Sequence, residues 1–156
     1  MTDFELSDEL VILIGQLDRL GNYYLNHSFE KNGYPITREQ WIIMKILYEK
    51  NGVSQQDLAD ELMKNKASIT SLIENMEKKD LISRKTNSFD KRSKMVFLTE
   101  KGKDLRQKID DYFHQITMQF VNEIEISNLN MTKSVLEKIL DNLVTLKRKD
   151  AAFSHH

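Results

Sequence analysis

The stretch SQQDLADELMKNKASITSLIENMEKK, residues 54–79, predicts two short helices joined by a tight turn. Ser54 stands three residues before Asp57, the spacing of a capping box, in which a hydroxyl and a carboxylate each bind a free amide of the first turn. Asn65 is placed to cap the second helix, predicted over Lys66 to Lys79. The apolar residues of that helix recur at i, i+3, i+4 and i+7 and form one stripe, made of Ile69, Leu72, Ile73 and Met76.

The opposite face of the second helix carries small polar and basic side chains. They are Lys66, Ser68, Thr70, Ser71, Asn75 and Lys78. Two short helices with such a face match the helix-turn-helix, whose second helix enters the major groove of DNA. On this face we expect DNA contacts from Lys66, Ser68, Thr70, Ser71 and Asn75, together with Lys64 and Asn65 in the preceding turn. An ordinary solvated face is the alternative, and Thr70 has a second interpretation as a hydroxyl bonded to its own backbone.

The next residues, 80–102, predict a two-stranded hairpin with a basic tip. Two β-compatible runs, 81–85 and 94–98, flank a polar loop without apolar anchors. An arginine at the tip of a thin ribbon reaches the minor groove, where negative potential is concentrated, while lysines approach phosphates. Asp90 is placed to orient the guanidinium of Arg92. The candidate DNA contacts of the ribbon are Arg84, Asp90, Lys91, Arg92 and Lys94.

These motifs resemble the winged helix-turn-helix of the multiple-antibiotic-resistance regulator (MarR) family. The resemblance is carried by Leu58-Ala59, Ser68-Ile69-Thr70, Leu81-Ile82-Ser83-Arg84, Asp90-Lys91-Arg92-Ser93-Lys94 and Leu98-Thr99-Glu100-Lys101-Gly102. It implies a mainly α fold with a small β-hairpin wing, and a dimer built from long N- and C-terminal helices. Three residues differ from the family's pattern. Asp80 stands where a glycine usually ends the recognition helix, and Ser71 and Asn75 stand where basic residues are common.

Composition and charge fit this interpretation. The chain of 156 residues has no cysteine, which excludes disulfides and thiol redox sensing. Its net charge is −1, yet residues 64–103 hold eleven Lys or Arg and five Asp or Glu, a local charge of +6 that leaves −7 for the rest. Such a division steers one face toward a polyanion. No apolar run approaches the length of a membrane span, so we expect no membrane contact and a cytoplasmic location.

Helical periodicity also covers both ends of the chain. We predict helices from about Leu6 to His27, from Thr37 to a close at Asn51-Gly52, from Thr99 to about Ile124, and from about Met131 to Lys149, with a break at 127–130. The expected organisation is one domain, 1–150, in which 37–100 form the DNA-binding lobe and 6–28 and 102–149 the dimerisation helices. A disordered tail follows at 151–156, and His155-His156 is interpreted as a tag remnant. The terminal apolar stripes exceed what the lobe covers, so we expect a second subunit to cover them.

A cleft between dimerisation helices and lobe is the place where the resemblance implies a small aromatic or anionic ligand. The candidate residues are Tyr24, Tyr34, Trp41, Tyr48, Tyr112 and Phe113. Aromatic residues at helical spacing belong more often to a core, and that alternative stays open. We expect no metal and no cofactor, because the chain has four histidines and no metal-ligand spacing.

The leading hypothesis is a homodimeric transcription regulator, most often a repressor, that binds a palindromic operator on double-stranded DNA and is released by a small-molecule effector. The alternative is a winged-helix protein-interaction module that has lost sequence-specific DNA binding. We find no nucleophile–base pair and no phosphate-binding glycine loop, so an enzyme is not expected.

Overall fold

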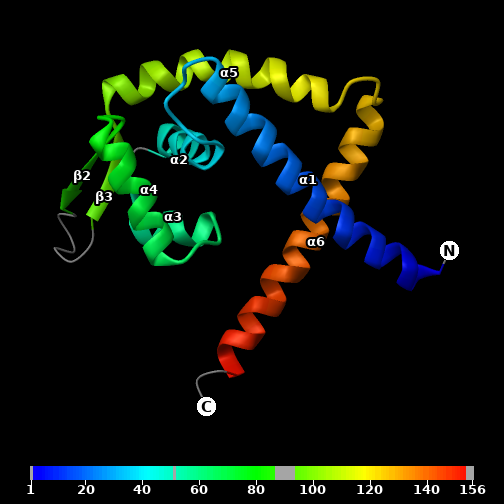
Figure 1. The fold of residues 1–156 in the computed structure, drawn as a ribbon. Coiled ribbons are helices and arrows are strands. Elements are labelled where there is room, and N and C mark those ends of the chain that lie inside the picture. Colours follow the sequence, from blue (N-terminus) through cyan, green and yellow to red (C-terminus); the bar gives the residue numbers. More distant parts are fainter. Residues whose placement is uncertain (1, 51, 87–93, 154–156) are drawn as a thin grey trace. The chain divides into compact units, whose positions relative to one another are not determined.

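The computed structural model describes residues 2–50, 52–86 and 94–153. Within these ranges the chain forms six helices and three strands (Figure 1). In chain order they are α1 (Asp3–Lys31), α2 (Arg38–Glu49), β1 (Val53–Ser54), α3 (Gln55–Glu61), α4 (Lys66–Lys78), β2 (Ile82–Thr86), β3 (Lys94–Leu98), α5 (Glu100–Phe120) and α6 (Ile126–Phe153). The chain divides into two compact units, Met1–His114 and Gln115–His156. None of the helices in the described ranges is both long and apolar enough to cross a membrane.

The helix starts follow from capping side chains. Thr37 and Gln40 form the predicted capping box of α2, and Asn65 caps α4 by accepting the amide of Ser68 at 2.8 Å. Ser54 caps α3 through the amide of Asp57, but the carboxylate of Asp57 accepts the Ser54 hydroxyl itself, so only half of that predicted box forms. A box at Thr2 and Glu5, which the sequence analysis did not use, starts α1 three residues earlier than predicted.

The sheet has three antiparallel strands in the order β1-β3-β2. The predicted hairpin is confirmed as β2 and β3, and β1 adds a third strand that the sequence did not predict. The additional strand pairs Val53 with Val96 and Ser54 with Met95. Two residues are too few to show the period-two pattern by which a strand is identified in a sequence. In the β2–β3 pair, Ile82 lies opposite Leu98 and Thr86 opposite Lys94, which fixes the register of the wing.

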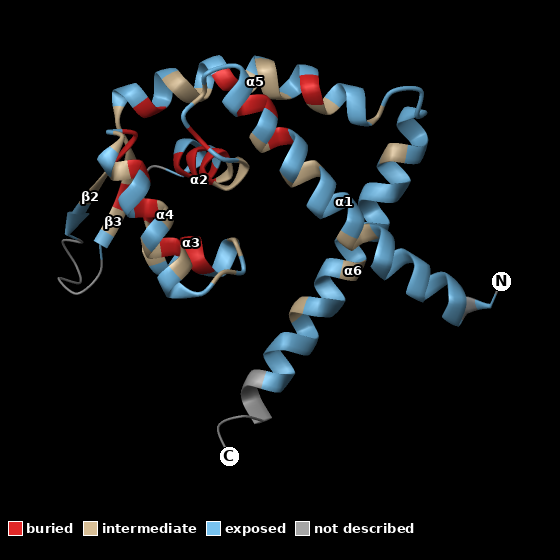
Figure 2. Ribbon diagram, in the orientation of Figure 1, coloured by how far each residue is buried: buried red, intermediate tan, exposed pale blue. Residues whose placement is uncertain are grey.

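The core of the first unit joins the end of α1 to the helix-turn-helix, the sheet and α5. Its fully buried side chains are Phe29, Ile43, Met44, Leu58, Ile69, Ile73, Met76, Leu81, Ile82, Val96 and Ile109. Figure 2 shows this burial on α2, α3 and α4, whereas most of α1 before Leu25 is exposed. Three of the four residues of the predicted α4 stripe are buried, and Leu72 is half-buried. The stripe therefore fixes which face of α4 remains in solvent.

In the second unit the predicted break at 127–130 was wrong. The break lies at 121–125, where Glu123 has a φ of 61°, and α6 begins at Ile126. The small polar residues that suggested a break lie in the first turn of α6, where the amide of Asn128 donates to the carbonyl of Glu125. Such residues are favoured at a helix start, so their composition alone did not distinguish a break from a beginning. The helix continues to Phe153, into the stretch expected as a tail, and residues 154–156 lie outside the described residues.

Candidate nucleic-acid interface

The solvent face of α4 is the centre of the candidate interface. Lys66, Ser71, Asn75 and Lys78 are exposed, and Ser68 and Thr70 are half-buried at its edge. The buried stripe on the other side anchors the helix to the lobe. A helix held in this way presents one polar and basic row to a groove of DNA.

Several predicted contact residues also have partners within the lobe. The Thr70 hydroxyl donates to the carbonyl of Lys66 at 2.9 Å, which is the structural role that the sequence left open. Asn75 Oδ1 accepts a hydrogen bond of 3.0 Å from Nε2 of Gln40, a buried residue of α2. Lys64 forms an ion pair of 2.6 Å with Glu39. Lys66 and Ser71 are thus the predicted residues at which the exposed face is most directly open to DNA.

Arg84 is held by a carboxylate of the recognition helix. Its Nε lies 3.2 and 3.1 Å from the two carboxylate oxygens of Glu77, and its Nη2 bonds to Oε2. The hydrogen bond from Arg84 keeps the pKa of Glu77 below its ordinary value, while burial acts in the opposite direction. This pair connects the base of the wing, β2, to the last turn of α4. Sequence analysis did not identify Glu77, and the spacing of seven residues across a turn gives no periodic signal.

Of the wing residues predicted to contact DNA, Lys94 is exposed at the start of β3. Asp90, Lys91 and Arg92 lie outside the described residues. The structure therefore places both strands of the wing and the residue that ends its tip.

The structure around the end of α4 explains the roles of Thr99 and Gly102 in the run Leu98-Thr99-Glu100-Lys101-Gly102. Asp80 follows the helix with a φ of 59°, the left-handed conformation that a glycine adopts without strain. Thr99 supports it, because the Thr99 hydroxyl donates to the Asp80 carbonyl at 2.7 Å and accepts the amide of Gly102 at 3.0 Å. A Cβ at Gly102 would lie 2.1 Å from the carbonyl oxygen of Leu81. The first turn of α5 thus packs directly on Leu81, the residue between Asp80 and the start of β2.

Four of the predicted effector residues pack against one another around Phe29. Trp41 stacks on Phe113 with ring centroids 3.7 Å apart, and Tyr34 lies 5.4 Å from Tyr112. Phe29 contacts both Tyr34 and Phe113. Stacked rings at this distance leave no room for a molecule between them. These side chains therefore join α1, α2 and α5 as packing residues.

The other two predicted effector residues are exposed at the surface. Tyr24 and Tyr48 are 44% and 55% exposed. The Tyr48 ring lies under the Arg106 guanidinium, 3.9 Å from its carbon, and Arg106 pairs with Asp110 at 2.7 Å. An effector pocket lined by all six aromatic residues stays a prediction.

Comparisons with known proteins agree with this geometry. Residues 36–94 match the model of the MarR family. The chain is 26% identical over 113 residues to the HTH-type transcriptional regulator MgrA of Staphylococcus aureus, an alignment that covers 72% of this chain and 76% of MgrA.

Solved structures extend the likeness to nearly the whole chain. The transcriptional regulator BldR from Sulfolobus solfataricus superposes with a TM-score of 0.84 at 22% identity, covering 91% of this chain and 99% of BldR. MepR in the S. aureus MepR–DNA complex superposes with a TM-score of 0.76 at 25% identity, covering 85% and 96%. These likenesses confirm the predicted winged helix-turn-helix fold. Residues 36–94 therefore match the MarR family, and the described part of the chain has the winged-helix fold of a solved MarR transcriptional regulator.

Proposed function

We propose that the chain acts as a homodimer that binds a palindromic operator on double-stranded DNA and represses transcription until a small molecule releases it. The observation that carries the proposal is the exposed basic and polar row of α4, anchored on a closed core and tied to the wing through Glu77 and Arg84. The solved MepR–DNA complex supports DNA as the partner. The wing residues Asp90, Lys91 and Arg92 belong to the proposed interface on sequence grounds.

Apolar exposure supports the dimer. In the first unit, α1 exposes Val11 by 71%, Leu17 by 61% and Leu20 by 67%. In the second unit, α6 exposes Met131 by 69% and Leu143 by 57%. Rows of this size on single helices indicate a protein interface. A two-fold dimer would cover them and would present two recognition helices about one turn of DNA apart, roughly 34 Å.

Release by a ligand requires that the ligand bind one arrangement of the two lobes better than another. The ligand would bind at the aromatic residues named above or elsewhere on the lobe. A regulator with this partner would act in the cytoplasm, where its operator is accessible.

The experiment that tests the proposal is binding of the purified protein to DNA from its own upstream region. A scrambled duplex of equal length is the control, and both are measured at two salt concentrations with the stoichiometry of the complex. We expect one dimer per site, preference for the upstream duplex, and a steep loss of affinity with salt, because several phosphates release counterions. Weak binding that is equal for both duplexes, by a protein that is folded and dimeric, would contradict the proposal and favour the protein-interaction module.

A further inference from the structure

A buried glutamine connects the start of α2 to the recognition helix. Gln40 is 3% exposed and lies in the first turn of α2. Its Oε1 accepts the amide of Thr37 at 3.2 Å, and its Nε2 donates to Oδ1 of Asn75 at 3.0 Å. The side chain of Gln40 thus joins the capping box of α2 to the solvent face of α4.

The direction of these hydrogen bonds is fixed by the backbone amide of Thr37. A backbone N–H can only donate, so the end of the Gln40 amide that meets Thr37 is its oxygen. The other end is the NH2 group, which can only donate, so Asn75 must turn its own oxygen toward it. The Nδ2 group of Asn75 remains, and no residue in the described ranges accepts a hydrogen bond from it. Since Asn75 is exposed, this donor is available to an acceptor outside the protein.

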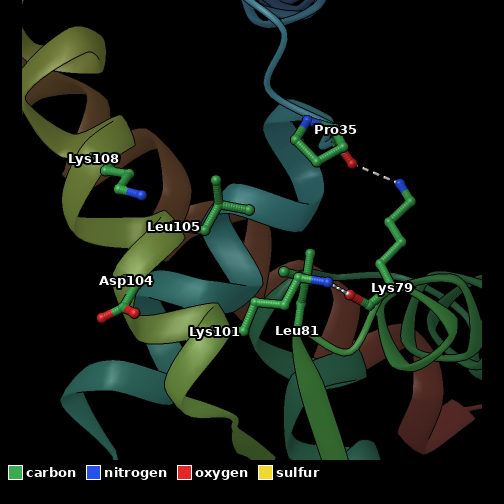
Figure 3. A pocket seen from close by; sticks show the side chains of 7 residues that line it. All are labelled: Pro35, Lys79, Leu81, Lys101, Asp104, Leu105 and Lys108. Carbon is green, nitrogen blue, oxygen red and sulfur yellow. Dashed lines mark hydrogen bonds between the residues drawn. The ribbon is translucent and has the colours of Figure 1, made fainter.

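A second hydrogen bond holds the same two elements together. Lys79 follows Asn75 by four residues, so the two side chains lie on the same side of the helix. Lys79 Nζ donates to the carbonyl oxygen of Pro35 at 2.7 Å, and Lys101 Nζ donates to the carbonyl oxygen of Lys79 at 2.7 Å (Figure 3). The start of α2 is therefore tied to α4 at two points one turn apart, which holds the Gln40–Asn75 bond in place.

We propose that Gln40 is a positioning residue that determines specificity, because it holds Asn75 so that Asn75 meets the operator as a hydrogen-bond donor. The inference rests on the proposed function for its DNA partner. In the major groove guanine and thymine offer acceptors, whereas cytosine offers only a donor. A donor held in one orientation favours guanine or thymine over cytosine at the contacted base pair. An asparagine without this partner is free to turn its oxygen outward and loses the preference.

Gln40→Glu reverses the orientation of Asn75 and keeps the cap of α2. Glutamate and glutamine both complete a capping box with threonine, so Thr37 keeps its partner. The second carboxylate oxygen can only accept, so Asn75 must turn its Nδ2 toward it and its Oδ1 outward. Asn75→Asp also presents an acceptor to the groove while Gln40 is unchanged, and it decides the question if Gln40→Glu fails to fold.

NMR of the DNA-free protein tests the orientation independently of DNA binding. We expect the Nε2 protons of Gln40 to exchange slowly with solvent and the Nδ2 protons of Asn75 to exchange fast. In Gln40→Glu the Nδ2 group of Asn75 becomes hydrogen-bonded, and its exchange slows by about tenfold. Exchange at Asn75 that is slow in the wild type, or equally fast in both proteins, would overturn the proposed orientation.

Affinities for operator duplexes that carry every single base change test the specificity. Asn75→Ala identifies the contacted base pair as the one at which it abolishes the preference. There the wild type should prefer guanine or thymine over cytosine by about tenfold, and Gln40→Glu and Asn75→Asp should reverse this preference. Gln107→Glu, the same change at an exposed position of α5, should leave the preference unchanged, because an added charge lowers all affinities alike.

A preference that survives both Gln40→Glu and Asn75→Asp would overturn the specificity role. A loss of affinity in Asn75→Ala that is equal for all duplexes would also overturn it, since it would mean that Asn75 contacts a phosphate. If the wild type binds no duplex selectively, the proposed function fails and the specificity role fails with it. The NMR exchange rates would still decide how Gln40 orients Asn75.

Discussion

Glu77 of α4 and Arg84 of β2 are joined by three hydrogen bonds, two from Nε and one from Nη2 of the arginine. The side chains are 37% and 20% exposed, so the pair lies at the edge of the lobe. A planar guanidinium held by two carboxylate oxygens has one orientation. The pair therefore fixes the angle between the recognition helix and the wing.

The first prediction concerns the role of Arg84 in DNA binding. If Arg84 acts by positioning the wing, Arg84→Ala and Glu77→Gln each weaken operator binding by a similar factor, about three- to tenfold, and the double variant is no weaker than either single one. Fluorescence anisotropy with an operator duplex measures all four affinities. If Arg84 instead contacted a phosphate, Arg84→Ala would cost much more than Glu77→Gln, because removal of an acid near DNA lessens repulsion.

Acid should remove the stabilisation that this pair supplies. Arg84 lowers the pKa of Glu77 below its unfolded value of about 4.3, so the stabilisation is complete above that value and is lost as the pH falls through the lowered pKa. The contribution is at most about 1 kcal/mol, because a half-exposed pair is screened by solvent. Urea unfolding from about pH 7 to about pH 3 should show the wild type and Glu77→Gln converging in acid. A constant difference over this range would exclude the pair as its source.

Replacing Asp80 should change the free energy of unfolding in a direction that the structure defines. Its Cβ is strained at a φ of 59°, and its carboxylate stands near the negative end of the α4 dipole. Asp80→Gly should raise the free energy of unfolding by about 0.5–1 kcal/mol, seen as a higher urea midpoint with an unchanged slope. Asp80→Ala is the matched control, since it removes the charge and keeps the Cβ. Equal stability of the two variants would show that backbone strain is not stored there.

Gly102 should tolerate no side chain. An added Cβ would lie 2.1 Å from the Leu81 carbonyl oxygen, which accepts the amide of Thr99 at 3.1 Å, so backbone must move. We expect Gly102→Ala to lose about 3 kcal/mol of stability. Gly21→Ala, in the middle of α1 where a Cβ meets nothing within 4 Å, should instead be neutral or gain up to about 1 kcal/mol. Thermal unfolding measures the stability of both variants. A loss at Gly102→Ala much smaller than expected would mean that α5 can shift away from the Leu81 carbonyl at little cost.

Local signals predicted most of the fold. Periodicity located the α4 stripe, and side-chain chemistry located the caps at Thr37 and Asn65, because both effects act within a few residues. β1 and the start of α6 were not predicted. The two residues of β1 form a strand only because they pair with Val96 and Met95 of β3, and that pairing leaves no local pattern in the sequence. The start of α6 was missed because small polar residues are common both in helix breaks and at helix starts.

The sequence predicted which face of α4 carries polar and basic side chains, but not which of the candidate residues are bound to other side chains of the lobe. The polar and basic face of α4 is exposed as the apolar stripe predicted, yet Arg84 is paired with Glu77, and Asn75 with Gln40. These partners lie on other elements, so no spacing in the sequence announces them.

Substitutions of Lys66 should change DNA binding and fold stability in opposite directions, so they separate the two effects. It is the first residue of α4, it is exposed, and the first turn of that helix holds no acid to match the positive end of the dipole. Lys66→Glu should therefore stabilise the fold by about 0.3–1 kcal/mol relative to Lys66→Gln. Operator affinity should fall by more than about tenfold, and Lys66→Gln should reduce the slope of log affinity against log salt by about 1, the share of one phosphate contact. A glutamate variant that gains stability and keeps its affinity would show that the start of α4 does not approach the DNA backbone. Loss of affinity together with a gain in stability would show that Lys66 contributes to DNA binding while lowering the stability of α4.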